Sequence, residues 1–177
     1  MAESNTRVVL FCDCHQFSLV QLSLGDRTFG FLDELYRRGG ECLVRNGGRI
    51  IKYLGDAILA TFLGDCGDDA VLAAECLRRE YAVLVREHGI DLETDMEVGL
   101  SLGDVQEGEL GHDTLRGFDV FGECVNEAAM IGHHRGIAVT GALRARLSAA
   151  IRVRELEPYR PKWRATPLEV WEVVGRD

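Results

Sequence analysis

Apolar residues along the chain fall into short runs typical of strands and into longer stretches with helical spacing. The run at residues 7–12 (RVVLFC) is uninterrupted and β-prone, which predicts a buried strand. Residues 29–45 and 68–88 instead place apolar side chains three or four positions apart, with charged residues between them. That spacing predicts two amphipathic helices.

Two further apolar runs, residues 49–54 and 57–63, meet at Gly55 and Asp56. Short β-prone runs joined by a Gly-Asp pair predict a tight hairpin. The rest of the chain is expected to hold strands at residues 93–102, 137–140, 151–156 and 168–174, a turn-rich segment at 103–111, and helices at 123–132 and 143–150. This mixture predicts an α+β or α/β domain built around the hairpin.

Length and charge limit the classes of protein that the chain can represent. We expect its 177 residues to form one compact domain, residues 1–177, because no repeat or long linker divides them. The net charge of −9 argues against broad binding to nucleic acid or to anionic membranes, which needs a basic surface. The N-terminal residues are polar and no apolar run is long enough to span a membrane, so a soluble, cytoplasmic protein is expected.

The cysteines fit the same expectation. There are six of them, with no repeated C-x-x-C pair. Cys12 and Cys14 share one face of the first predicted strand, but two thiols without partners are too few for a zinc site. We therefore expect reduced thiols packed in the core.

Two aspartates stand where strands are predicted to end. Asp13 follows the buried run at residues 7–12 and precedes a turn into a helix, whose backbone N–H groups can hold phosphate oxygens. Asp56 lies at the tip of the hairpin. Two carboxylates on adjacent strand ends can hold two Mg²⁺ or Mn²⁺ ions together with a triphosphate. Taken alone, Asp56 is more typical of a turn-forming residue in a hairpin, and the pairing with Asp13 and the flanking residues favours the metal site.

A third segment, residues 118–129 (FDVFGECVNEAA), leads from a strand end through a glycine into a helix that carries Asn126. Within it, Asp119 either contacts a ligand or caps the helix. Lys52, in the first strand of the hairpin, is either a ligand-binding group or a solvated strand residue. The residues alone leave both alternatives open.

Four blocks in this order resemble the catalytic domain of class III adenylyl and guanylyl cyclases. Besides the strand that ends at Asp13, they are residues 48–62 (GRIIKYLGDAILATF), residues 103–108 (GDVQEG) and the segment around Asn126. Residues 167–173 (PLEVWEV) resemble the closing strand of the same family. The resemblance covers the whole chain and implies an α+β fold, with helices packed on a ferredoxin-like, antiparallel-rich sheet.

The resemblance also implies roles for individual residues. Asp13 and Asp56 would be the metal ligands, and we include the neighbouring Cys14 in the metal-binding set. Asn126 would be a catalytic residue that holds the ribose. The nucleotide-binding set would consist of the base-reading pair Lys52 and Asp119, the triphosphate-binding Lys162, and the segment formed by Cys14, His15, Gln16 and Phe17.

In this family the metal ligands come from one subunit and the base, ribose and phosphate residues from the other. The resemblance therefore implies a homodimer with composite active sites. One departure concerns the arginine that the family places four residues after the asparagine, where Met130 stands. Arg135, Arg160 and Arg164 are the candidates to replace it, and the sequence does not rank them.

The activity implied is cyclisation of a nucleoside triphosphate to a 3′,5′-cyclic nucleotide and pyrophosphate. Lys52 and Asp119 suit adenine, and Lys52 can equally donate to a pyrimidine carbonyl, so ATP and UTP or CTP both remain open. A cyclase domain without attached modules resembles the bacterial Pycsar enzymes, which make cyclic UMP or cyclic CMP in antiphage defence and signal to a separate effector. The alternative, suggested by Met130, is a catalytically weak cyclase-homology domain that binds nucleotide as a regulatory module.

Overall fold

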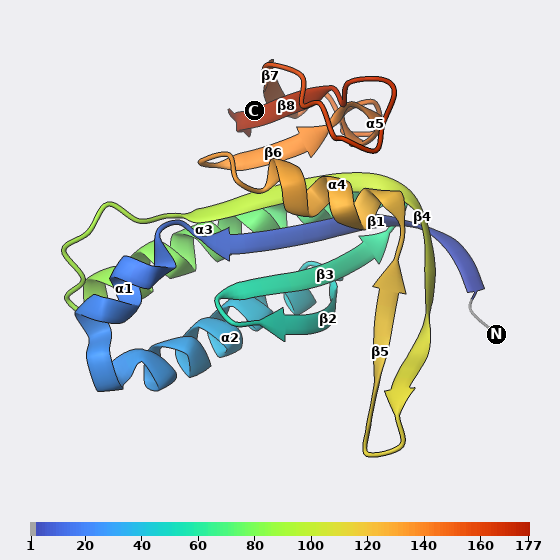
Figure 1. The fold of residues 1–177 in the computed structure, drawn as a ribbon. Coiled ribbons are helices and arrows are strands. Elements are labelled where there is room, and N and C mark those ends of the chain that lie inside the picture. Colours follow the sequence, from blue (N-terminus) through green and yellow to red (C-terminus); the bar gives the residue numbers. More distant parts are fainter. Residues whose placement is uncertain (1–2) are drawn as a thin grey trace.

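The computed structural model describes residues 3–177, so the first two residues of the polar N-terminal segment and of the expected domain lie outside it. Figure 1 shows the arrangement of its strands and helices. The elements in chain order are β1 (Glu3–Cys14), α1 (Phe17–Leu24), the 3-10 turn η1 (Gly25–Arg27), α2 (Thr28–Arg45), β2 (Arg49–Leu54), β3 (Ala57–Leu63), α3 (Gly67–Glu87), β4 (Met96–His112), β5 (Leu115–Phe121), α4 (Glu123–Ile131), β6 (Ile137–Thr140), α5 (Gly141–Arg144), β7 (Ile151–Glu155) and β8 (Val170–Arg176). Across residues 3–177, none of the helices is long and apolar enough to cross a membrane.

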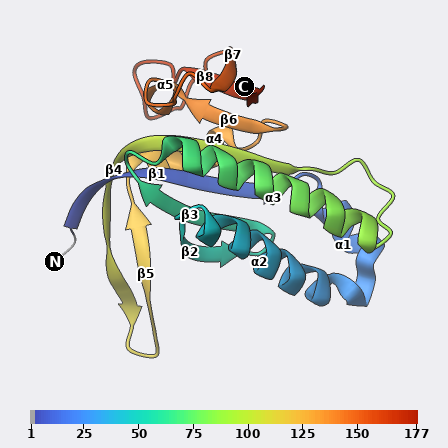
Figure 2. The same ribbon diagram turned by 180° about the vertical axis from the view of Figure 1, so that it is seen from behind.

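The strands form one mostly antiparallel sheet in the order β2-β3-β1-β4-β6-β8-β7, and β5 pairs with β4. Helices α2 and α3 cover one face of this sheet, and α4 lies on the other (Figures 1 and 2). The β4–β5 hairpin extends away from the body of the sheet (Figure 1). The expected α+β class, with helices packed on an antiparallel-rich sheet, is confirmed.

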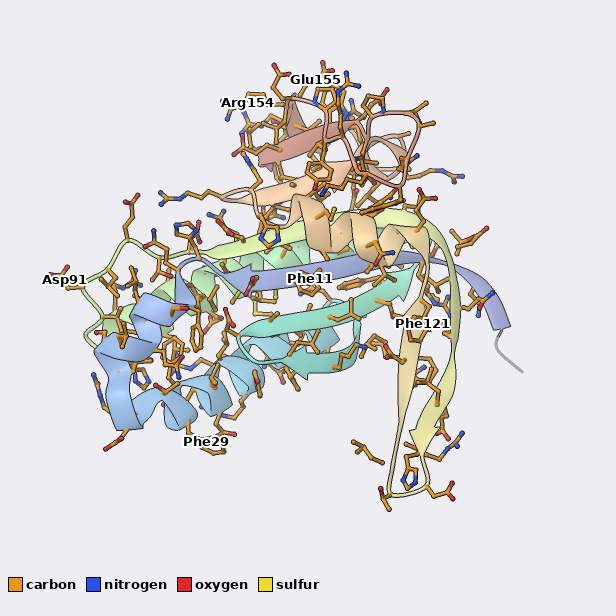
Figure 3. The ribbon with its side chains drawn as sticks, viewed as in Figure 1. Phe11, Phe29, Asp91, Phe121, Arg154 and Glu155 are labelled. Carbon is orange, nitrogen blue, oxygen red and sulfur yellow. A yellow bond between two sulfur atoms is a disulfide. The ribbon has the colours of Figure 1, made fainter. Side chains whose placement is uncertain are left out.

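Side chains alternate along β1 between the two faces of the sheet, as a strand with helices on both sides requires. Leu10 and Cys12 belong to the main core, with residues of α2 and α3. Val9 belongs to a smaller cluster with residues of α4, and the partly buried Phe11 packs against that cluster. Figure 3 labels Phe11 on β1. By the same alternation, Asp13 faces the α4 side at the end of the strand.

Helix α4 approaches β4 closely because glycine occupies the contact positions. A Cβ atom on Gly99 would lie 2.0 Å from the carbonyl oxygen of Ala128, and one on Gly103 would lie 3.0 Å from the Cβ of Cys124. Any larger residue would push the helix away from the sheet. The glycines of β4 therefore set the distance between the sheet and α4, the helix that carries Asn126.

The hairpin and both long helices were predicted nearly to their ends, but two segments differ from expectation. Residues 103–111 were expected to be turn-rich, yet they continue β4 as far as His112. They are extended because Gly103 to Glu107 pair with β1 and Gln106 to His112 pair with β5, partners that a local pattern does not reveal. The helix expected at residues 143–150 is shorter, spanning Gly141–Arg144.

The expectation that all cysteines are reduced is wrong for one pair. Cys42 of α2 and Cys76 of α3 form a disulfide, with Cα atoms 5.6 Å apart. These helices pack side by side on one face of the sheet, and their antiparallel course brings together two positions that are 34 residues apart in sequence. The other cysteines are free, as expected, and Cys12, Cys14 and Cys124 are buried.

Candidate active site

Asp13 and Asp56 come together at one end of the central strands. Cys12 of β1 pairs with Ile58 of β3, so the end of β1 lies beside the β2–β3 turn that carries Asp56. The backbone N–H of Cys14 donates a hydrogen bond of 3.3 Å to Oδ2 of Asp56. The two carboxylates predicted to share a site are therefore neighbours in the folded chain.

The surroundings of Asp56 favour its protonated form when no cation is present. Burial, together with the hydrogen bond and charge of the neighbouring Asp13 carboxyl, raises the pKa of Asp56 to about 7. Two carboxyl groups this close cannot both ionise cheaply unless a positive charge lies between them. The pair thus has the electrostatic character of a cation site.

The donor set suits a hard divalent cation better than zinc. Among residues 3–177, no group of three or more His, Cys, Asp or Glu side chains is placed to hold a metal ion. Zinc sites need three or four such ligands. Mg²⁺ and Mn²⁺ accept one or two carboxylates and complete their shells with backbone carbonyls, water and substrate phosphates. Asp13 and Asp56, with the backbone of Cys14, fit that pattern.

The turn after β1 is held by hydrogen bonds to the residues just before β4. The backbone N–H of His15 donates to the carbonyl of Asp95 at 2.8 Å, and the Thr94 hydroxyl donates to the carbonyl of His15 at 2.6 Å. Gln16 adopts a left-handed conformation, with φ at 56°, and begins α1. Of the four residues expected to meet phosphate, Cys14 and His15 thus have their N–H groups engaged. Those of Gln16 and Phe17 form no hydrogen bond within the described chain.

Lys52 and Asp119 form a second pair, on β2 and β5. Nζ of Lys52 lies 2.6 Å from Oδ2 of Asp119. The other carboxylate oxygen accepts a hydrogen bond of 2.8 Å from the N–H of Val120. Since α4 is capped by Gly122 and Asp119 lies within β5, the interpretation of Asp119 as a helix cap is wrong. The structure joins the two residues expected to read the base, although they are 67 positions apart.

Asn126 and Met130 lie one turn apart on α4. Asn126 is exposed, and Met130 is half-buried. Met130 lines a cavity of about 440 Å³ together with residues of the loop after β7, among them Leu156 and Tyr159. Lys162 lies further along that loop and is exposed. The α4 helix and the β7–β8 loop thus form one wall, distinct from the turn that carries Asp56.

The three arginines considered as replacements for an arginine at position 130 differ in their surroundings. Arg135 pairs with Glu93 at 2.6 Å and contacts the ring of His15 at 3.1 Å. Arg164 pairs with Glu127 and Glu123 of α4. Arg160 is exposed and follows Tyr159, which bridges to Leu168 and lines the Met130 cavity. Arg160 itself does not line that cavity.

The two sets of predicted site residues are not connected to each other. Among the described residues, no hydrogen bond or ion pair joins Asp13 or Asp56 to Lys52, Asp119 or Asn126. Asp13 and Asp56 meet at the end of β1 and the β2–β3 turn, whereas Lys52 meets Asp119 between β2 and β5.

Sequence reasoning missed Glu127, a buried carboxylate on the sheet side of α4. The side chain of Glu127 is 8% exposed and accepts a hydrogen bond of 2.7 Å from the Ser101 hydroxyl. A signal was present in the sequence. Positions 124, 127, 128 and 131 have the spacing of one buried helical stripe, and a glutamate interrupts their otherwise apolar character.

Comparisons with known proteins bear on the family and the fold of the chain. The family model described as the adenylate and guanylate cyclase catalytic domain matches residues 1–167. No curated protein sequence matches the chain.

Solved structures of cyclases share the fold. The adenylyl cyclase CyaB from P. aeruginosa is 20% identical, with a TM-score of 0.87 over 100% of this chain and 97% of that one. The guanylyl cyclase Cya2 is 19% identical, with a TM-score of 0.87 over 99% of this chain and 95% of that one. A bacterial light-regulated adenylyl cyclase is 20% identical, with a TM-score of 0.85. The match covers 100% of this chain but only 54% of the light-regulated protein, so the chain spans about half of its length.

The matched family model covers nearly the whole chain, and its range includes both Asp13 and Asp56. The chain belongs to the adenylate and guanylate cyclase catalytic domain family.

Proposed function

We propose that this protein is an active nucleotidyl cyclase, which converts a nucleoside triphosphate into a 3′,5′-cyclic nucleotide and pyrophosphate. The observation that carries the proposal is the neighbouring carboxylate pair of Asp13 and Asp56 on adjacent strand ends, with the raised pKa of Asp56. A degenerate member of the family would have no reason to retain two ionisable groups in this costly arrangement.

The reaction is an in-line displacement at the α-phosphorus. The ribose 3′-oxygen forms a bond to the α-phosphorus as its proton leaves, and the bond from the α-phosphorus to the bridging oxygen breaks, releasing pyrophosphate. Asp13 and Asp56 would hold two Mg²⁺ or Mn²⁺ ions, which supply charge neutralisation and lower the pKa of the attacking hydroxyl. The chain itself contributes mainly positioning and fixed charge.

The remaining residues of the site would act from the partner subunit of a homodimer. Asn126 orients the ribose, Lys162 contacts the triphosphate, and Lys52 with Asp119 contacts the base. Each chain then contributes its metal pair to one site and its α4 wall to the other.

Lys52 and Asp119 restrict the base without selecting one. The ammonium group donates hydrogen bonds and the carboxylate accepts them, so the pair suits the edge of adenine and also the carbonyl and amino groups of cytosine. Uracil would accept a hydrogen bond from the lysine through a carbonyl group. Both adenylyl and guanylyl cyclases share the fold. We therefore keep two substrate classes: ATP, for cyclic AMP signalling, and UTP or CTP, for a cytoplasmic defence signal to a separate effector.

A second candidate function rests on Met130. Without a positively charged side chain at this position of α4, a weak cyclase-homology domain would bind nucleotide and regulate a partner instead of catalysing cyclisation. The pairing of Arg135 and Arg164 with carboxylates favours this candidate, because neither guanidinium is free in the described chain.

One product assay separates these functions. The pure protein is incubated with ATP, GTP, CTP or UTP and Mn²⁺, and the products are separated by chromatography. The proposed enzyme releases a cyclic nucleotide and pyrophosphate in equal amounts from at least one triphosphate. Product from UTP or CTP with little from ATP selects the pyrimidine class. Binding of a triphosphate without any cyclic product supports the regulatory module and contradicts the proposed activity.

A further inference from the structure

A buried ion pair fastens the β7–β8 loop to α4. The Glu127 carboxylate accepts from the Ser101 hydroxyl through Oε2 and from the Arg164 guanidinium through Oε1. Ser101 in turn accepts a hydrogen bond of 3.3 Å from the Thr140 hydroxyl. Both oxygens of this carboxylate are thus engaged, and its position is set by β4 and β6 beneath it.

Arg164 also contacts a second carboxylate, one turn earlier on α4. Its Nε lies 3.3 Å from Oε1 of Glu123, whose side chain is 57% exposed, against 8% for Glu127. Exposed ion pairs contribute little, whereas removing one partner of a buried pair leaves an uncompensated charge. Glu127 is therefore the anchor of the loop, and Glu123 is a weaker second contact.

The anchored segment of the loop is a turn with Lys162 at its tip. The backbone N–H of Arg164 donates a hydrogen bond of 3.2 Å to the carbonyl of Pro161, which closes the turn over Lys162 and Trp163. On the helix, Glu127 directly follows Asn126. One ion pair therefore joins the turn that presents Lys162 to the part of α4 that presents Asn126.

We propose that Glu127 and Arg164 are positioning residues that hold Lys162 at the correct distance from Asn126 and so set the affinity for the triphosphate of the substrate. This inference rests on the proposed function, in which Lys162 contacts the triphosphate. It assigns Arg164 a role through Lys162 and not a contact with nucleotide of its own. The two carboxylates that neutralise the guanidinium support that assignment, because they leave little net positive charge to attract phosphate.

The test is a double-mutant cycle on KM for the preferred triphosphate, with kcat and Tm measured on the same samples. Lys162→Ala should raise KM by about tenfold or more, the size of one charge-assisted hydrogen bond. Arg164→Ala should raise KM in the same direction. The double variant should match Lys162→Ala within about twofold, because an effect transmitted through Lys162 disappears with Lys162.

Two results overturn the proposal. If the two substitutions multiply in the double variant, Arg164 contacts the nucleotide independently of Lys162. If Arg164→Ala lowers Tm or kcat and leaves KM unchanged, the ion pair is only structural. Arg164→Lys, which keeps one charged contact to Glu127, should recover part of the KM effect.

Matched controls protect the cycle from misfolding and from failure of the proposed activity. Glu123→Gln removes only the exposed contact and should change KM by less than about twofold. If Arg164→Ala does not fold, Glu127→Gln with Arg164→Gln removes both charges together and leaves no unpaired buried ion. If no triphosphate is turned over, the enzyme proposal fails. The same cycle is then measured with the dissociation constant of Mn-ATP in place of KM. The positioning role is overturned if the effects of Lys162→Ala and Arg164→Ala multiply in the double variant. It is also overturned if the unmodified protein does not bind Mn-ATP.

Discussion

Asp56 occupies a position where local and long-range effects meet. Gly55 before it has φ at +67°, which lets the β2–β3 turn close tightly. Asp13, which lies 43 residues earlier in sequence at the end of β1, shares its surroundings. Helix α2 supports the turn, because the Tyr36 hydroxyl donates a hydrogen bond of 2.5 Å to the carbonyl of Gly55. A carboxyl group held this firmly next to another should couple cation binding to proton release.

The first prediction concerns this coupling. The folded pKa of Asp56, about 7, lies above its ordinary value of 3.8, so between these pH values the folded chain binds more protons than the unfolded chain. Stability without metal should therefore fall as pH rises through that window, and Mn²⁺ must displace the proton below pH 7. Mn²⁺ affinity, measured by calorimetry, should rise about tenfold per pH unit up to about pH 7 and level off above it. Asp56→Asn should bind weakly at every pH, and a constant affinity in the unmodified protein would contradict the coupling.

Met130 supports a second prediction at the same scale. An arginine there would add a donor toward the α-phosphate, and the loss of one such preorganised donor costs about 10²-fold to 10³-fold in rate. Met130→Arg should raise kcat on the preferred triphosphate by about tenfold or more. The gain should be smaller than the full effect of a preorganised donor, because the surroundings of residue 130 do not hold the new side chain in its productive geometry. Met130→Leu is the size-matched control and should leave kcat nearly unchanged. A Met130→Arg protein that folds but is no faster would show that another group already performs this task.

Elements whose shape is decided locally were predictable, and those decided by distant partners were not. The β2–β3 hairpin follows from two β-prone runs around Gly55 and Asp56. Residues 103–111 look like a turn because they are rich in glycine and charge, but they are extended by pairing with β1 and β5. In the site, Asp13 and Asp56 could be proposed from position in the chain. The pairing of Lys52 with Asp119 came only through the family resemblance, and Glu127 did not emerge at all.

The disulfide between α2 and α3 leads to a prediction at the scale of elements. In the loop-entropy description, cross-linking residues 34 positions apart stabilises the fold by about 3–4 kcal/mol. Cys42→Ser with Cys76→Ser should therefore lower Tm under non-reducing conditions and have the same Tm as the unmodified protein under reducing conditions. Titration of thiols in denaturant should find four free groups without reductant, corresponding to Cys12, Cys14, Cys66 and Cys124. Six free thiols would show that the bond does not form in solution.

For the whole molecule, the main consequence of the fold is that the Asp13–Asp56 pair is built on other elements than Asn126 and Lys162. Asp13 and Asp56 lie at the ends of the central strands, whereas Asn126 lies on α4. Leu115 and Phe121 of β5 are exposed and leave apolar surface on this strand, where Figure 3 labels Phe121. Under the proposed function, a second copy of the chain would complete each site.

Mixing two inactive variants tests this arrangement. Asp56→Ala destroys the metal half of both sites, and Asn126→Ala destroys the ribose half of both. In a mixed dimer, one site carries both lesions and the other carries neither. An equimolar mixture should therefore recover up to about a quarter of the unmodified activity per protein, since half of the dimers are mixed and each has one intact site. If subunits exchange and the mixture stays inactive, the composite site is wrong.

The most direct measurement is the rate of cyclic nucleotide formation by Asp56→Asn beside the unmodified protein, with the preferred triphosphate and saturating Mn²⁺. Asparagine keeps the size of the side chain and its place in the turn but removes the charge that holds the cation. We predict the same circular dichroism spectrum for both proteins, with turnover lower by about 10³-fold or more in the variant, because charge stabilisation by a bound metal contributes several kcal/mol to the transition state. Turnover within about tenfold of the unmodified protein would contradict the assignment of cyclisation to the Asp13–Asp56 pair.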